Sequence, residues 1–269
     1  MPQDFDLYER ELWAGRAPSY ERGFARLTQY MVGPLLDAAG VGGGTRLLDV
    51  GTGPGIVSAA AIRRGAEVSA LDADPEMAET ARKNVPGLDV RVAVLPDVPF
   101  EDAAFGAVAG NFVINHVGAP DLALAALRRV LRPAGWLALS CWAMPAAAGV
   151  LTAVREAIDE AGVPVPDDIP ESPFMEYGEP AAFRRLVMEA GFTDVSVEEM
   201  TWEHVVDPEY WWETGALSKV GTNGVIIGRQ DAATVARIKV AYDGVITRYA
   251  TPDGKIALPA HALLASAAR

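Results

Sequence analysis

The amino-acid sequence predicts an α/β fold built on a doubly wound, mainly parallel sheet, and three observations lead to this prediction. Apolar runs of strand length alternate with helical patterns through the middle of the chain. One of these runs, 105–114, is almost continuously apolar, as strands covered on both faces are. A glycine-rich turn, LLDVGTGPG at 47–55, joins the first buried run to the first helical pattern. Strands joined by helices in this way predict helices on both faces of one sheet.

The first half of the chain contains five expected strands. They lie at 45–51, 67–72, 88–95, 105–114 and 136–142. Helices are expected at 56–64 and 121–131. A third helix is expected after Asp74, which can cap it, because Pro75 suits its first position and Glu76 its first turn.

The second half adds two expected strands, at 194–204 and 256–268, which bring the sheet to seven. Helices are expected at 146–161 and 181–190, on either side of the proline- and acid-rich loop 164–174. A later helix carries apolar side chains on one face, namely Val235, Ile238, Tyr242, Val245, Ile246 and Tyr249. We predict one domain over 1–269, with an N-terminal helical lid at 1–40, a core at 41–145, inserted helical cap segments at 146–180 and 207–253, and the rest of the sheet within 181–206 and 254–269.

Composition limits the classes of partner. The 269-residue chain has 36 acidic and 23 basic side chains and a formal net charge of −13, which disfavours nucleic acid and anionic membranes. The start MPQDFDLYER lacks the basic and apolar regions of a secretory leader, and no apolar run is long enough to cross a bilayer, so we expect a cytoplasmic protein. The single cysteine, Cys141, lies in the apolar run LALSCWAM, and we expect a buried, unreactive thiol.

The glycine-rich turn predicts a cofactor site on a Rossmann-like unit. Gly51, Gly53 and Gly55 occupy alternate positions, and bare backbone there lets an adenosine-bearing ligand lie near the helix N-terminus. A dinucleotide turn has the spacing G-x-G-x-x-G, but here the third glycine comes one residue early. Asp49 before the turn disfavours pyrophosphate and suits a cationic ligand with an amino group, and Asp72 ends the second strand, where it can accept hydrogen bonds from both ribose hydroxyls. A tight loop with no ligand is the alternative, which this register of Asp49, turn and Asp72 disfavours.

These segments resemble the class I S-adenosylmethionine-dependent methyltransferases, in the branch that contains ubiquinone/menaquinone and small natural-product methyltransferases. The resemblance covers roughly Leu12 to Trp142 and rests on LWAGRAPSYERGF, LLDVGTGPG, VSALDADPEM, VPFEDAAFGAVAGNFVINHV and ALRRVLRPAGWLAL. The last two are among the more specific segments, because they match the family's fourth strand, the following helix and the fifth strand in order. The Ala- and Arg-rich style also resembles proteins from high-GC bacteria, where such enzymes often modify secondary metabolites.

The resemblance implies S-adenosylmethionine as the cofactor, with S-adenosylhomocysteine as its product. The glycine turn with Thr52 would line the methionine and ribose side, Asp72 would bind the ribose, and Met77 would pack on the adenine. The full predicted cofactor set is Tyr20, Asp49, Gly51, Thr52, Gly53, Gly55, Asp72, Ala73, Met77, Val94, Leu95, Asn111 and Phe112.

Two parts of this implied set differ in how well they match the family. The backbone at Asn111 and Phe112 would face the amino acid portion of the cofactor, and Tyr20 would close over it from the lid. The family often places an aspartate after the third strand to bind the adenine amino group, but Val94 holds that place here and Leu95 follows it. The resemblance therefore leaves adenine recognition to backbone groups and apolar packing.

Candidate catalytic residues are few. His116, in NFVINHV, falls at the carboxyl end of the fourth strand, where doubly wound sheets bind ligands, and it either organises the loop or acts as a general base. His204, in TWEHVV, is interpreted as a strand residue, and His261 lies in the last strand. Side chains of the cap segments supply further candidates for a base or a cation-stabilising carboxylate, or for part of the substrate wall: Glu171, Glu176, Glu213 and Tyr177.

The cap segments also supply candidates for substrate binding. Tyr210, Trp211 and Trp212 could wall an aromatic or isoprenoid-like substrate, or could only pack the cap against the sheet. No metal site is expected, because GNFVIN offers only Asn111 and Asn115 where metal-dependent catechol-type methyltransferases place acidic ligands. The [DN]-P-P-[YF] segment of enzymes that methylate amino groups of DNA bases or glutamine is also missing.

The sequence therefore predicts methyl transfer to oxygen or carbon of an uncharged small molecule, and the resemblance implies a secondary metabolite as that molecule. Three alternatives stay open: an S-adenosylmethionine-binding enzyme of other chemistry, such as a cyclase or decarboxylase; a non-catalytic binding protein on the same fold; and, as the weakest, a nicotinamide dehydrogenase. The oligomeric state is left open, with a homodimer among the states allowed.

Overall fold

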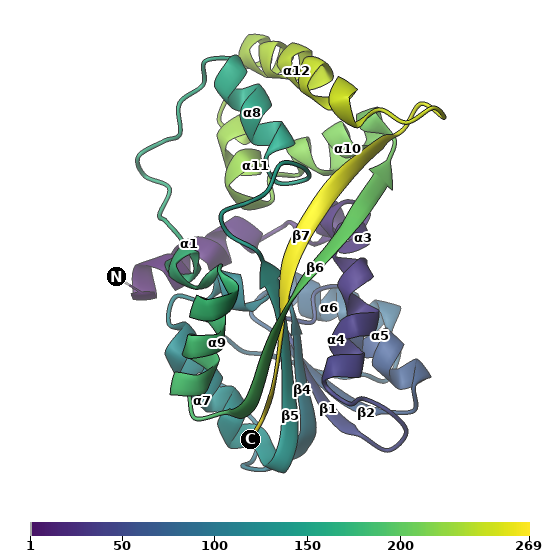
Figure 1. Ribbon diagram of the computed structural model, residues 1–269, viewed down its shortest axis with the longest axis vertical. Helices are drawn as coiled ribbons and strands as arrows, with labels where there is room; N and C mark the ends of the chain where they lie inside the picture. Colours follow the sequence, from purple (N-terminus) through teal and green to yellow (C-terminus); the bar gives the residue numbers. More distant parts are fainter. Residues whose placement is uncertain (1) are drawn as a thin grey trace.

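The computed structural model describes residues 2–269, which form a seven-stranded mixed sheet with helices on both faces (Figure 1). The strand order is β3-β2-β1-β4-β5-β7-β6. The first five of these are parallel, β7 runs antiparallel to β5, and β6 runs antiparallel to β7 at the edge. Their bounds are β1 Arg46–Val50, β2 Glu67–Asp72, β3 Asp89–Val92, β4 Phe105–Asn111, β5 Leu131–Trp142, β6 Thr193–Val206 and β7 Ile256–Ala268. The predicted fold class is confirmed.

The strand bounds differ from expectation mainly at β5. The segment Arg132–Gly135 lies between the expected helix at 121–131 and the expected strand at 136–142, but β5 already begins at Leu131. Leu131 pairs with Phe105, the register then shifts, and regular pairing resumes between Ala107 and Trp136. Ala134 lies inside this irregularity at φ +58. The turn chemistry is therefore present, but it forms a bulge within the ladder, where extra residues on one strand face fewer on its partner.

Helices cover the two faces of the sheet in the arrangement that alternating strands and helices predict. One face carries α4 (Val32–Ala38), α5 (Ile56–Arg63) and α6 (Pro75–Asn84), and the other carries α7 (Pro120–Val130) and α9 (Pro180–Glu189), as Figure 1 shows. Asp74 caps α6 by accepting a hydrogen bond from the Met77 backbone N–H at 2.8 Å, which confirms the expected start of this helix. The predicted buried thiol of Cys141 is also confirmed, and burial raises its pKa.

The two C-terminal strands extend beyond their neighbours as a long antiparallel ribbon (Figure 1). β5 pairs with β7 only over 262–268, whereas β6 pairs with β7 from Ile256 onward. Four helices pack around the far end of this ribbon: α8 (Ala153–Glu160), α10 (Pro208–Thr214), α11 (Gly221–Gly228) and α12 (Ala232–Ile246). We call these four the cap helices. The ribbon thus supports an apolar layer that is separate from the core of the sheet.

Two features of the cap helices differ from the sequence patterns. The helix expected at 146–161 begins only at Ala153, because the chain before it passes tightly over β7. A side chain at Gly149 would meet the Pro259 carbonyl at 2.0 Å, and the Val150 N–H donates to that same carbonyl at 2.9 Å. The second feature, α11, was not expected from the glycine-rich segment GTNGVIIG. Helix α12 buries the predicted apolar face on Ile238, Tyr242, Val245 and Ile246.

The N-terminal part of the chain is helical, as expected. It contains α1 (Pro2–Trp13), α2 (Ala17–Arg22) and α3 (Phe24–Thr28), which we call the lid helices. They lie near the carboxyl ends of the parallel strands, between the sheet and the cap helices (Figure 1). Among the described residues, no helix has the length and apolar character needed to traverse a membrane.

Candidate functional site

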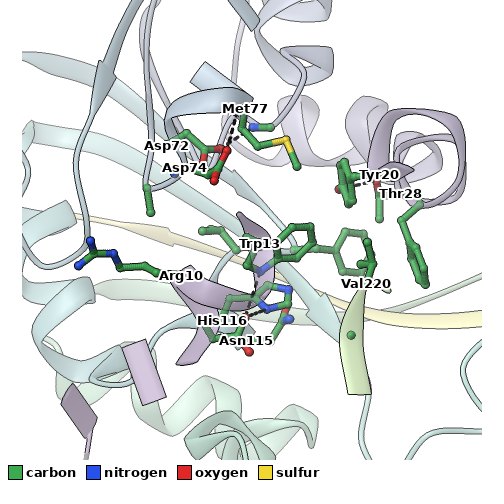
Figure 2. A pocket seen from close by; sticks show the side chains of 18 of the residues that line it. Arg10, Trp13, Tyr20, Thr28, Asp72, Asp74, Met77, Asn115, His116 and Val220 are labelled. Atoms are coloured by element: carbon green, nitrogen blue, oxygen red, sulfur yellow. Dashed lines mark hydrogen bonds and ion pairs between the residues drawn. The ribbon is translucent and has the colours of Figure 1, made fainter. Parts of the chain in front are cut away.

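A cavity of about 920 Å³ lies at the carboxyl ends of the parallel strands, below the cap helices and beside the lid helices. Doubly wound sheets bind their ligands at this edge, where loops after neighbouring strands converge. Twelve of the residues that the sequence singled out line this cavity, and Figure 2 shows several of them. They are Tyr20, Gly51, Gly53, Asp72, Ala73, Met77, Val94, Leu95, Asn111, Phe112, His116 and Trp211.

The glycine turn brings bare backbone to the cavity wall. Gly51 has φ +65, and a Cβ built on it would lie 2.5 Å from the side chain of Val113. Gly53 has φ +54, and the Tyr20 ring lies 3.6 Å from where its Cβ would be. Residues with a side chain rarely adopt this left-handed conformation, so the backbone favours glycine at both positions, and at Gly51 the nearby Val113 side chain also leaves no space for a Cβ. Gly55 does not line the cavity but caps α5 at φ +87, where a Cβ would crowd Val85.

Asp49 stabilises the glycine turn through hydrogen bonds on the side away from the cavity. Its side chain is fully buried, and its Oδ2 accepts hydrogen bonds from the Thr52 hydroxyl at 2.7 Å and from the Ser58 hydroxyl at 2.6 Å and backbone N–H at 3.0 Å. Oδ1 has no partner within the described part of the chain. Burial raises the pKa of this carboxyl, against the lowering effect of its donors. Asp49 and Thr52 lie behind the cavity lining, so in this structure they hold the turn in shape.

Asp72 lies at the end of β2 in the cavity wall, with both oxygens anchored. Oδ2 accepts from the Gly53 N–H at 2.7 Å and Oδ1 accepts from the Asp74 N–H at 2.9 Å. Burial raises the pKa of Asp72 to about 6, although these two donors act to lower it. Each carboxylate oxygen can accept more than one hydrogen bond. The fixed carboxylate can therefore receive two hydroxyl donors from a ligand beside the turn.

An apolar shelf continues from Asp72 along the same wall. Met77 is almost fully buried on α6, and Leu95 is similarly buried after β3. Both line the cavity with Ala73 and Val94. A flat aromatic ligand group can pack between such side chains. The shelf adjoins the carboxylate, as the adenine side of an adenosine site requires.

Asn111 and Phe112 lie at the end of β4 in an unusual backbone geometry. Phe112 has φ +54, and its N–H donates to the Ser140 hydroxyl at 3.0 Å. The Asn111 side chain accepts from that hydroxyl at 2.7 Å and donates to the Thr28 carbonyl at 3.2 Å. Sequence reasoning assigned only the backbone of Asn111 to the site, but its side chain also connects the sheet to the lid helices.

The lid helices cover the turn through polar contacts. Tyr20 is hydrogen-bonded to Thr28 at 3.3 Å, and burial raises the pKa of its hydroxyl. Asn84 of α6 donates to Glu21 at 2.8 Å and to the Pro54 carbonyl at 3.0 Å. One side chain of the core thus contacts both the lid helices and the glycine turn.

A cluster of Glu9, Trp13 and His116 joins α1 to the loop after β4. Glu9 Oε2 lies 2.8 Å from His116 Nδ1 and accepts from Trp13 Nε1 at 3.0 Å. The Trp13 and His116 rings meet edge to face, with centroids 5.2 Å apart, and both line the cavity (Figure 2). Sequence reasoning missed Glu9 and Trp13. Their i, i+4 spacing places Glu9 and Trp13 on the same face of a helix. No signal in the neighbouring sequence predicts that this face meets His116, which is 107 residues from Glu9.

The far wall of the cavity is mainly apolar, with Thr222 and Asn223 of α11 as its polar members, and comes from the cap helices and the chain segments beside them. We call it the cap end, formed by Trp142, Val150, Leu151, Val154, Trp211, Ala216 and Val220. The opposite wall, with Gly51, Gly53, Asp72 and Met77, is the glycine-turn end. Charged side chains in the lining come from α1 and the end of β2, namely Asp6, Glu9, Arg10, Glu11, Asp72 and Asp74. The cap end therefore suits an uncharged ligand group.

Several predicted site residues lie outside the cavity lining. Tyr177 and Glu176 belong to a short 3₁₀ helix at Pro173–Tyr177, where Tyr177 packs on the core of the sheet. Tyr210 donates its hydroxyl to the Arg22 carbonyl at 2.8 Å, and the Trp212 ring packs on Tyr242 with centroids 5.0 Å apart. Glu171 and Glu213 do not line the cavity either. Trp211 alone of the three cap aromatics does so, and it is also almost completely buried.

Residues 2–269 contain no group of three or more His, Cys, Asp or Glu side chains placed to hold a metal ion.

A family model described as "Methyltransferase domain" matches residues 48–139, which include the glycine turn, β2, β4 and most of β5. A demethylmenaquinone methyltransferase of Renibacterium salmoninarum is 33% identical over 111 residues, 41% of this chain and 47% of the relative. A ubiquinone biosynthesis O-methyltransferase of Xanthomonas oryzae pv. oryzae is 37% identical over 102 residues, 36% of this chain and 43% of the relative. The chain thus spans less than half the length of these curated relatives.

Solved structures share the fold over most of the chain. The YcgJ protein of Bacillus subtilis matches with a TM-score of 0.57 and 19% identity, covering 89% of this chain and 98% of that one. A phosphoethanolamine N-methyltransferase of Haemonchus contortus, solved with S-adenosylhomocysteine, matches with a TM-score of 0.52 and 15% identity over 89% of this chain and 52% of that one. The [4+2]-cyclase SpnF matches with a TM-score of 0.53 and 19% identity over 89% and 80%. The matched domain and the shared fold confirm the resemblance that the sequence motifs indicate.

Proposed function

We propose that this chain, which belongs to the class I S-adenosylmethionine-dependent methyltransferases, transfers the methyl group of that cofactor to oxygen or carbon of an uncharged small molecule. One observation carries the proposal. A single cavity joins the glycine turn and Asp72 at one end to the apolar cap end at the other. A charged donor and an uncharged acceptor can therefore occupy the same cavity.

The residues at the glycine-turn end fit the cofactor. Gly51 and Gly53 present bare backbone in the left-handed conformation to the cavity, and a Cβ at Gly51 would collide with Val113. Asp72 is fixed to accept the ribose hydroxyls, and Met77 lies beside it for the adenine. Tyr20 and Asn111 line the same cavity, and we assign them to the methionine side. When bound, the cofactor supplies an electrophilic methyl group on a sulfonium.

The protein's part in such a transfer is alignment and exclusion of water. The nucleophile must approach the methyl group in line with the breaking bond, and an enclosed site supplies much of the rate by holding the two reactants in that geometry. The lid helices close one side of the cavity through the contacts of Glu9 and Asn84. The apolar residues of the cap end, Leu151 and Val220 among them, are our candidates for binding the acceptor.

The names of the quinone-pathway relatives support an acceptor of small-molecule size. Those relatives act in menaquinone and ubiquinone synthesis by name, and this chain shares about a hundred residues with each. We extend that size class, and secondary metabolites in particular, to this chain as part of the proposal. The net charge of −13 also disfavours nucleic acid as the acceptor.

Methyl-labelled S-adenosylmethionine tests the proposal directly. The purified protein is incubated with it and, in separate reactions, with uncharged phenols, hydroquinones and β-dicarbonyl compounds, with total RNA and with denatured protein extract. We expect label in an organic-extractable product, with an equal amount of S-adenosylhomocysteine. Label found only in RNA or protein would contradict the proposal.

One competing chemistry has its own outcome in that assay. The fold is shared with a protein named as a cyclase, so the fold does not by itself select methyl transfer. An acceptor that is converted while the donor keeps its methyl group would identify non-methyl-transfer chemistry. Binding of S-adenosylhomocysteine without conversion of any compound would identify a binding protein.

A further inference from the structure

We propose that Glu9, on lid helix α1, positions His116 as the proton acceptor for a hydroxyl group of the acceptor molecule. This inference rests on the proposed function and narrows the acceptor to a compound with an ionisable hydroxyl, such as a phenol or an enol. Glu9 comes from the lid helices and His116 from the loop after β4. The pair is therefore assembled only when α1 lies against that loop.

The hydrogen bonds fix which imidazole nitrogen is available. Glu9 Oε2 lies 2.8 Å from His116 Nδ1, and a carboxylate at this position accepts a hydrogen bond from the Nδ1–H group. The tautomer with a proton on Nδ1 leaves the lone pair on Nε2, and the only hydrogen bond of the His116 ring within the described chain is the one at Nδ1. The His116 side chain lines the cavity and is 30% exposed. Its basic nitrogen is therefore the one left for a ligand.

The side chain of Glu9 is itself fixed in position by burial and by a second hydrogen bond. Its side chain is only 12% exposed, and the same Oε2 accepts the Trp13 indole N–H at 3.0 Å. Asp6, one helical turn earlier, accepts the Gly118 backbone N–H at 2.6 Å. Two carboxylates of α1 thus hydrogen-bond to the loop after β4, one at His116 and one at Gly118. A buried carboxylate needs such donors to offset its desolvation, which is why the contact specifies a geometry.

No other imidazole competes for this role. His204 lies outside the cavity lining against the Trp211 ring, and burial lowers its pKa to about 4. His261 also lies outside the lining and pairs with Glu199 at 2.9 Å. In the described chain, His116 is the one histidine that lines the cavity.

The pair supports removal of the hydroxyl proton of the acceptor during methyl transfer. The acceptor oxygen forms a bond to the methyl carbon while the carbon–sulfur bond breaks, and the electron pair of that bond stays on sulfur. The hydroxyl proton moves to His116 Nε2. The resulting imidazolium is stabilised by Glu9 and returns its proton to water after the products leave. The chain of carboxylate, imidazole and hydroxyl follows the general pattern of an oriented base.

The first experiment measures turnover with the phenol or hydroquinone that the label assay identifies. We expect His116→Ala to lower kcat by about a hundredfold and Glu9→Ala by about tenfold or more, with KM within about threefold, because a positioned base contributes roughly 10²–10⁴. The double variant should be no slower than His116→Ala, because Glu9 acts through the imidazole. Glu160→Ala, on an exposed end of α8, is the matched carboxylate control and should be unchanged.

The second experiment needs no acceptor. ¹⁵N spectra of the imidazole groups, with S-adenosylhomocysteine bound and His116→Ala used for assignment, report which nitrogen carries the proton. We expect the Nδ1–H tautomer in the natural protein and a mixture in Glu9→Ala. Glu9→Gln, which keeps the side-chain volume, serves for the kinetic comparison if Glu9→Ala unfolds.

Several results would overturn the inference. They are an unchanged tautomer in Glu9→Ala, a kcat within twofold of the natural protein in both Glu9 variants, or an effect of Glu9→Ala that multiplies that of His116→Ala. Failure of the proposed function is a distinct result, in which no hydroxyl compound gains label. The tautomer measurement still decides the role of Glu9 in that case.

Discussion

The two ends of the cavity are built from different parts of the chain. The glycine-turn end comes from one stretch, Gly51 to Met77, and its key groups are held by hydrogen bonds to backbone N–H groups within that stretch. The cap end comes from segments around residues 142, 150–154 and 211–224, and it is held by apolar packing on the β6–β7 ribbon. The difference shows that one end is built by local backbone geometry and the other by a surface that only tertiary packing creates.

The largest effect is expected at the glycine turn. Gly51→Ala places a methyl group 2.5 Å from Val113 in a left-handed backbone conformation, so we expect S-adenosylhomocysteine affinity to fall more than about a hundredfold. Gly40→Ala is the matched control, since Gly40 has φ +62 but no atom within 4 Å of its Cβ. Titration calorimetry should show normal affinity for the control. Equal affinity in both variants would mean that the turn does not contact the cofactor.

A smaller effect is expected at Asp72. Asp72→Asn should weaken S-adenosylhomocysteine binding about 10- to 100-fold, because charged hydrogen bonds are worth roughly 1.5–3 kcal/mol. Hydroxyl donors of the ligand favour the ionised form of the Asp72 carboxyl. Because burial raises the pKa of this carboxyl to about 6, the affinity for S-adenosylhomocysteine should fall as the pH drops from 7 to 5. Asp72→Asn should remove that part of the pH dependence. A pH profile unchanged by the substitution would assign the ribose to another residue.

The smallest effect on cofactor binding is expected at the cap end. Leu151→Trp fills space in the cavity, so turnover of the identified acceptor should fall about tenfold while S-adenosylhomocysteine affinity stays within twofold. Leu217→Trp, at a 38% exposed leucine of the same region outside the lining, is the control. A loss of cofactor affinity in Leu151→Trp would show that the two ends are not separate sites.

Much of the glycine-turn end was predictable because its signals are local. The spacing of the glycines, the acid at the end of β2 and the cap at Asp74 all act within a few residues of chain or across one strand–helix–strand unit. The same reasoning predicted the buried face of α12, since a helix repeats every 3.6 residues. It did not predict that Asp49 and Thr52 lie behind the cavity lining, because sequence order does not show the direction of a side chain in a turn.

The cap and the lid required the tertiary structure. The aromatic run Tyr210-Trp211-Trp212 has one composition but three surroundings, since only Trp211 reaches the cavity while its neighbours contact Arg22 and Tyr242. The late start of α8 depends on the close approach of Gly149 to Pro259, which lies 110 positions further along the chain.

By itself, the sequence determined the α/β sheet and the cofactor turn, because hydrophobic periodicity and glycine spacing are properties of neighbouring residues. Only the tertiary structure decided which side chains line the cap end and which carboxylate meets His116. Those contacts join residues as far apart as Glu9 and His116, and their geometry depends on how whole helices pack. Packing of that kind is fixed by the fold as a whole and has no counterpart in any short stretch of sequence.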